Sequence, residues 1–144
     1  MRLTKSNFLT FLDSPLHLWA SVNHQQDDRK FSAYDQLIAK QGYEVEALAK
    51  KFLEQKVATQ YPAGSTIHFQ YQLVDGSYEA KIDALVHDVV NNTYDLYEIK
   101  SSTKIDKQNK YDATFQHLIA KSTLPVNKTY LVHVNSDYVK DGEI

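Results

Sequence analysis

Two segments with the composition of β-strands, joined by a turn dipeptide, constrain the fold of this chain more than any other feature. Residues 80–86 and 94–100 are rich in β-branched, aromatic and other apolar residues, and Asn91-Asn92 lies between them. Paired asparagines tolerate the backbone angles that a two-residue hairpin turn requires. The sequence therefore predicts an antiparallel hairpin whose turn is Asn91-Asn92.

In that register Asp83 lies opposite Lys100, and residues that face each other across a strand pair share one side of the sheet. Glu98 lies on the same side, because side chains alternate with period two. A divalent metal would neutralise two carboxylates that are costly to bury unpaired. The alternative is an exposed ion pair between Glu98 and Lys100. A three-residue turn would instead direct Asp83 to the other face.

Apolar residues recur at helical spacing over residues 34–56, so a long helix is expected there. Gly42 interrupts this pattern at a cost of about 1 kcal/mol, which indicates a packing reason such as the close approach of a sheet. Glu46 follows one turn later at the flank of the apolar stripe and is expected to point toward the Asp83 cluster. The alternative for Glu46 is a surface acid.

The rest of the chain predicts an α/β fold with a mixed central β-sheet of about four strands flanked by helices. A helix at 110–122 precedes the last strand, and this strand–helix–strand order predicts one βαβ crossover with parallel strands. Two short helices are expected at the start, separated by Ser14-Pro15. The expected strands lie at 66–74, 78–90, 94–101 and 128–135.

The composition of the chain excludes several classes of protein and several kinds of site. The 144 residues fit a single domain spanning 1–144, and the formal net charge of −2 makes the chain no obvious polyelectrolyte binder. Without cysteine it has no disulfide, zinc–thiolate site or iron–sulfur cluster, which fits a cytoplasmic protein. No apolar run is long enough to span a bilayer, and the six histidines show no metal-ligand spacing.

The order of these motifs resembles the PD-(D/E)XK nuclease superfamily, in particular its RecB-like branch. Members of that branch carry G-x-x-x-E on a helix, Asp on a strand, E-x-K on the next strand and Gln on a following helix. The corresponding residues here are Gly42 and Glu46, Asp83, Glu98-Ile99-Lys100, and Gln116. The resemblance covers nearly the whole chain and implies a restriction-endonuclease-like core.

Two positions depart from the pattern of this branch. Ser14 stands where cluster-bearing members have Cys, so an iron–sulfur cluster is not expected. Ala120 stands where many members have Tyr, four residues after Gln116. The branch also usually continues past this length, so the chain is expected to be a fragment of a longer protein.

The resemblance implies a metal-dependent nuclease that hydrolyses phosphodiester bonds, with DNA favoured over RNA. Mg²⁺ or Mn²⁺ would be held by Glu46, Asp83, Glu98 and the backbone carbonyl of Ile99, which are hard oxygen ligands. Lys100 would orient the attacking water or stabilise charge on the phosphate, and Gln116 would hydrogen-bond one of these.

Lys104, Lys107 and Lys110 follow the E-x-K motif and either track a nucleic-acid backbone or form a solvated linker. Two other functions stay open at this point. One is a catalytically silent nuclease-fold module that binds nucleic acid or assembles within a larger protein. The other is a protein-interaction domain unrelated to nucleic acid.

Overall fold

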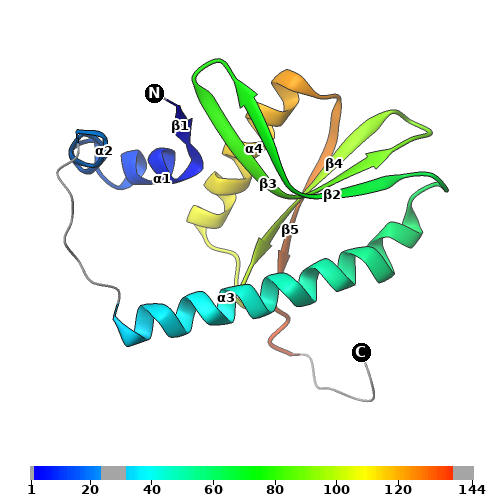
Figure 1. Cartoon of the computed structure of the whole chain (residues 1–144), viewed down its shortest axis with the longest axis horizontal. Helices are drawn as coiled ribbons and strands as arrows, with labels where there is room; N and C mark the ends of the chain where they lie inside the picture. The colour runs from blue at the N-terminus through cyan, green and yellow to red at the C-terminus, as the bar shows by residue number, and fades with distance from the viewer. Residues whose placement is uncertain (1, 24–31, 138–144) are drawn as a thin grey trace.

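The computed structural model describes residues 2–23 and 32–137, which form a mixed five-stranded sheet flanked by helices (Figure 1). The order β1-β3-β4-β5 runs across the sheet, and β2 also pairs with β3. The β1–β3 and β4–β5 pairs are parallel, and the other two are antiparallel. The strands are β1 (Leu3–Thr4), β2 (Thr66–Asp75), β3 (Tyr78–Asp88), β4 (Thr93–Lys100) and β5 (Val126–His133).

The helices lie on both sides of this sheet. The long helices are α3 (Ala33–Phe52) and α4 (Lys107–Thr123), and α3 continues into a π-helical turn, η1 (Leu53–Val57), and a 3₁₀ turn, η2 (Ala58–Gln60). Two short helices, α1 (Lys5–Asp13) and α2 (Pro15–Val22), open the chain. The α/β class with a mixed, helix-flanked sheet is therefore confirmed, and so is the parallel crossover from β4 through α4 to β5.

The break between α1 and α2 follows from side-chain capping. Thr4 caps α1 and exchanges hydrogen bonds with Asn7 in a capping box. Ser14 accepts a hydrogen bond from the backbone N–H of His17, and Pro15 occupies the first turn of α2, where no N–H is needed. The predicted stop and restart at Ser14-Pro15 is confirmed. The two-residue strand β1 was not expected, because it is too short to show an alternation.

The predicted two-residue turn at Asn91-Asn92 is wrong. Asp88 pairs with Thr93, so the turn spans residues 89–92. The Asp88 carboxylate accepts hydrogen bonds from the backbone N–H groups of Val90 and Asn91 and thereby fixes the longer turn. The register consequently moves by two residues, an even shift that leaves the paired residues 84–88 and 93–97 on their predicted faces.

The predicted extent and packing of the main helix need correction. The α-helix ends at Phe52, and only Ala49 among its residues is buried. A Cβ added at Gly42 would meet nothing within 4 Å, so the expected close approach of a sheet to Gly42 is wrong. The reason is that the N-terminal end of α3 extends beyond the sheet (Figure 1), which leaves Leu37 and Ile38 exposed.

The core forms two clusters, and alternate residues of β3 pass from one cluster to the other partway along the strand. Ile82 packs with Phe115 and Ile119 of α4, whereas Ala84, two residues later, packs with Leu53 of η1. In a regular strand residues two apart share a face. The irregularity coincides with a gap in the β2–β3 ladder, which pairs Phe69 with Ala84 and Tyr71 with Ile82 but leaves Gln70 and Asp83 unbridged. Asp83 therefore sits where β3 changes the face that it presents.

Candidate active site

Asp83 lies where β3 and β4 part. The backbone ladder between these strands ends at the pair Ala84 and Tyr97. One residue beyond it, Asp83 Oδ2 accepts a hydrogen bond of 2.8 Å from the backbone N–H of Ile99. A side chain thus takes the place of a ladder carbonyl. Because N–H and C=O of one strand residue point to the same side, the Ile99 carbonyl also faces the gap.

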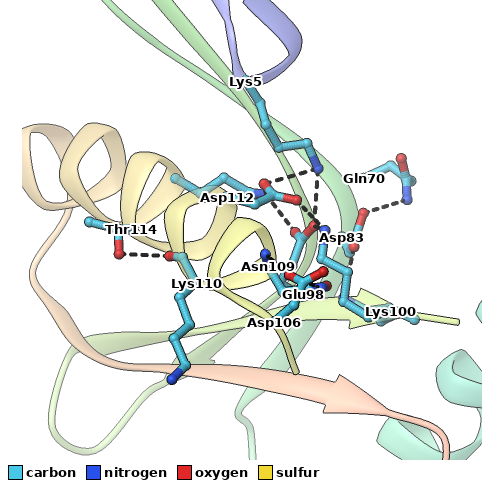
Figure 2. Close-up of polar contacts among 12 residues, drawn as sticks. Lys5, Gln70, Asp83, Glu98, Lys100, Asp106, Asn109, Lys110, Asp112 and Thr114 are labelled. Atoms are coloured by element: carbon cyan, nitrogen blue, oxygen red, sulfur yellow. Dashed lines mark hydrogen bonds and ion pairs between the residues drawn. The ribbon is translucent and has the colours of Figure 1, made fainter. Parts of the chain in front are cut away.

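Glu98 is the centre of the polar cluster and is only 2% exposed. Its Oε1 accepts from Lys5 Nζ at 3.0 Å and from Lys100 Nζ at 2.8 Å (Figure 2). Its Oε2 accepts from Gln116 Nε2 at 2.6 Å. Glu98 therefore contacts three elements, α1, β4 and α4, through one carboxylate.

Asp112 is a second buried carboxylate in this cluster, and sequence reasoning missed it. Asp112 accepts hydrogen bonds from Lys100 and, at 2.9 Å, from Gln116, and it lies 3.3 Å from Lys5 Nζ. The two ammonium groups therefore bridge the carboxylates of Glu98 and Asp112. The available signal was the spacing of four residues between Asp112 and Gln116, which puts both on one helix face.

Burial raises the pKa of Glu98 and of Asp112, whereas the neighbouring ammonium groups of Lys5 and Lys100 lower it. Burial and the nearby charge of Asp83 raise the pKa of Glu98 to about 7, against the opposing effect of Lys5 and Lys100. Burial also disfavours the charged form of Asp112, but the hydrogen bond from Lys100 and the charge of Lys5 outweigh it and lower its pKa. Burial opposes the charge of Lys100, yet Glu98 and Asp112 raise the pKa of Lys100 above its ordinary value.

The fully ionised cluster contains more negative than positive charge. Its carboxylates are Asp83, Glu98 and Asp112, and its ammonium groups are those of Lys5 and Lys100. Among the described residues, three negative charges against two positive ones leave an excess of one negative charge. A partly buried site of this kind attracts a further cation.

Glu46 lies at the edge of the site rather than inside it. Its Oε1 accepts from Gln70 Nε2 at 2.9 Å and pairs with Lys50 Nζ at 2.7 Å. Gln70 Nε2 is also 3.5 Å from Asp83 Oδ1, so Gln70 links Glu46 to Asp83. Gln70 was not foreseen from the sequence. It has a φ of 53°, and strand alternation gives no sign of such a left-handed residue.

The donor atoms suit a hydrated Mg²⁺ or Mn²⁺ ion. Asp83 and Glu98 supply carboxylate oxygens and Ile99 a carbonyl, and Mg²⁺ commonly takes one or two carboxylates and keeps several waters. The convergence of two ammonium groups on Glu98 Oε1 shows that this oxygen already attracts cations. Within the described residues, no three His, Cys, Asp or Glu side chains form a group that could hold a metal by themselves.

The three lysines after the E-x-K motif lie outside this cluster. Lys104, Lys107 and Lys110 are all exposed. Lys107 Nζ lies 5.3 Å from the centre of the Tyr111 ring, in a cation–π contact. Figure 2 shows the Lys110 side chain pointing away from Glu98. The structure thus brings Asp83, Glu98, Ile99, Lys100 and Gln116 together, and it leaves these three lysines on the surface.

A pocket of about 360 Å³ lies on the other side of the sheet, beside η1 and η2, and Asp95 is among the residues that line it. The Asp95 carboxylate accepts from Tyr61 Oη at 2.6 Å, Asn127 Nδ2 at 3.0 Å and the backbone N–H of Lys128 at 2.9 Å. These neutral donors satisfy the buried acid and tie η2 and the start of β5 to β4, so we assign Asp95 a structural role.

Comparisons with family models, with curated proteins and with solved structures found no match to this chain. No helix in the part of the chain that the structure describes is long and apolar enough to cross a membrane. Functional inference therefore depends on the geometry of the site.

Proposed function

We propose that this chain is a metal-dependent nuclease of the PD-(D/E)XK type that hydrolyses phosphodiester bonds of nucleic acid, with DNA favoured over RNA. One observation carries the proposal. Asp83, Glu98 and Lys100 meet at the point where β3 and β4 separate, and Gln116 of α4 holds Glu98 from the side. Such a cluster is costly to bury, and a site that binds a cation and a phosphate gives it a use.

Asp83, Glu98 and the Ile99 carbonyl would hold Mg²⁺ or Mn²⁺. The bound ion would polarise a phosphoryl oxygen and generate a nucleophilic water. Lys100 presents its ammonium group 2.8 Å from Glu98 Oε1, where it would orient that water or stabilise charge on the phosphate. Gln116 would fix the rotamer of Glu98 through its 2.6 Å hydrogen bond.

The proposal extends to the surroundings of the site. The exposed Lys104, Lys107 and Lys110 would contact the phosphate backbone of the substrate near the start of α4. A cytoplasmic location also belongs to the proposal, since it is inferred from composition. Glu46 would support the metal site through Gln70.

One observation favours a second candidate, a catalytically silent module that binds nucleic acid or assembles within a larger protein. Lys5 and Lys100 already neutralise most of the charge of Glu98 and Asp112, so the cluster can persist without a metal. A purely structural polar network would have this appearance.

Incubation of the protein with labelled single-stranded and double-stranded DNA and RNA, in the presence of Mg²⁺, Mn²⁺ or Co²⁺, separates the two candidates. Cleavage that is abolished by a chelator and by Asp83→Asn is the expected result. Binding of nucleic acid without cleavage of any substrate would favour the silent module.

A further inference from the structure

Among the described residues, two ammonium groups lie in the site, and the proposed reaction uses Lys100 but not Lys5. It comes from α1, whereas Glu98 and Lys100 lie on β4. Its Nζ lies 3.0 Å from Glu98 Oε1 and 3.3 Å from Asp112 Oδ1, and Figure 2 shows its side chain directed at both carboxylates. An ammonium group from the first helix thus occupies the acid to which a metal would bind.

The backbone around Lys5 is anchored on both sides. Before it, β1 pairs with β3, and the Leu3 N–H donates to the Ser77 carbonyl at 2.7 Å. After it, Phe8 stacks on Phe115 of α4 with ring centroids 5.1 Å apart. The fold therefore delivers Lys5 to Glu98 as a fixed part of the site. A mobile terminal lysine would lose more entropy on pairing and would occupy the acid less.

The side chain of Lys5 is nevertheless open to solvent on one side. The exposed fraction of its side chain is 30%, compared with 19% for the Lys100 side chain and 3% for the Glu98 side chain. If Lys5 leaves Glu98, Asp112 Oδ1 remains as a partner. Lys5 is therefore the more easily displaced of the two ammonium groups.

A carboxylate oxygen offers about two lone-pair directions. On Glu98 Oε1 both are engaged, by Lys5 and by Lys100. A cation that binds this oxygen must therefore displace or weaken one of the ammonium contacts. The two events are linked, so Lys5 must weaken metal binding by the same factor by which the metal weakens the Lys5 contact.

We propose that Lys5 competes with the divalent cation for Glu98 and so sets the metal affinity of the site, a deepening that rests on the proposed metal-dependent function. In the metal-free protein Lys5 holds the acidic cluster together. When Mg²⁺ or Mn²⁺ binds, Lys5 retreats to Asp112 and solvent.

The test measures binding of Mn²⁺ alone, through the electron paramagnetic resonance signal of the free ion, for wild type and Lys5→Met. Lys81→Met is the matched control, because Lys81 is an exposed lysine on β3, the strand that carries Asp83. Loss of a charged hydrogen bond that competes with the ion should tighten Mn²⁺ binding by about tenfold in Lys5→Met. An equal gain in both variants would indicate a general charge effect and overturn the competition, as would unchanged or weaker binding in Lys5→Met.

A second measurement needs no variant that could fail to fold. In the wild-type protein, the ¹⁵Nζ signal of Lys5 should shift during a Mg²⁺ titration, while that of the exposed Lys81 stays in place. A Lys5 signal that is unmoved at saturation would contradict the competition. Absence of any metal binding would overturn both the metal site and this inference, whereas a confirmed competition without cleavage would overturn the nuclease proposal alone.

Discussion

Asp83 Oδ2 accepts a 2.8 Å hydrogen bond from the Ile99 backbone N–H, one residue past the last bridge of the β3–β4 ladder. This contact lets the two strands part without leaving the partly buried Ile99 N–H unpaired. It also fixes Asp83 Oδ2 beside the backbone of Ile99, which lies between Glu98 and Lys100. The structural and the proposed catalytic roles of Asp83 thus use the same geometry.

Asp83→Asn and Asp83→Ala should therefore differ. The amide oxygen of Asn can still accept from Ile99, so this variant should fold like wild type while losing Mn²⁺ binding and turnover. Ala leaves the Ile99 N–H without a partner, which should lower the free energy of unfolding by about 1–3 kcal/mol. Urea denaturation and Mn²⁺ titration of both variants check this expectation. Wild-type metal affinity in Asp83→Asn would contradict the assignment of Asp83 as a ligand.

Lys100→Ala should separate catalysis from metal binding. An ammonium group cannot ligate a cation, and Lys100 occupies Glu98 Oε1, so metal affinity should not fall. Turnover should fall by about 10²–10³, the usual cost of losing one well-placed electrostatic stabiliser. The matched control is Lys81→Ala, which removes an exposed lysine from β3. Single-turnover cleavage and Mn²⁺ binding are the measurements, and equal rates for the two variants would exclude a catalytic role for Lys100.

The sequence pattern located the hairpin residues of the cluster for a physical reason. Strand alternation puts Glu98 and Lys100 on one side of β4 whatever the turn. The register moved by two residues rather than one, so the wrong turn did not flip the paired part of β3 relative to β4. The turn itself was missed because Asp88 folds back on the backbone of the next residues, a local choice that competes with the Asn91-Asn92 signal.

Lys5 and Gln70, two further residues of the site, could not be found by periodicity. Lys5 reaches Glu98 across 93 positions of the chain, and no local pattern encodes such a contact. Gln70 interrupts an otherwise regular alternation in β2 through its positive φ. Gly42 was misread because its helical spacing was correct while the sheet lies elsewhere, beside the C-terminal part of α3.

Glu46 should influence the metal through Gln70 rather than by direct ligation. Loss of a partner that orients a ligand typically weakens metal binding by about 10–100-fold. Glu46→Gln and Gln70→Ala should each weaken Mn²⁺ binding at the low end of this range. Because both residues act through one link to Asp83, the double variant should bind Mn²⁺ no more weakly than the weaker-binding single variant. A full Glu46→Gln effect in the Gln70→Ala background would instead show that Glu46 contacts the ion.

The metal-free protein should lose stability as the pH rises from about 4.5 to 7. Burial and the charge of Asp83 raise the folded-state pKa of Glu98 to about 7, from its ordinary value of 4.5. Between these values the unfolded chain releases a proton that the folded chain keeps, so the free energy of unfolding falls with pH and levels off above 7.

Three of the groups that surround Glu98 contribute outside this window. The lowered pKa of Asp112 and the raised pKa values of Lys5 and Lys100 place their contributions at lower and higher pH. The charge of Asp83 adds to the rise in the pKa of Glu98. Urea denaturation at several pH values between 5 and 8, with chelator present, compares wild type with Glu98→Gln, whose amide does not titrate. The difference in unfolding free energy between the two proteins should change across this interval in favour of Glu98→Gln. Parallel profiles would show that Glu98 titrates at its ordinary pKa and that the cluster is more hydrated than its burial indicates.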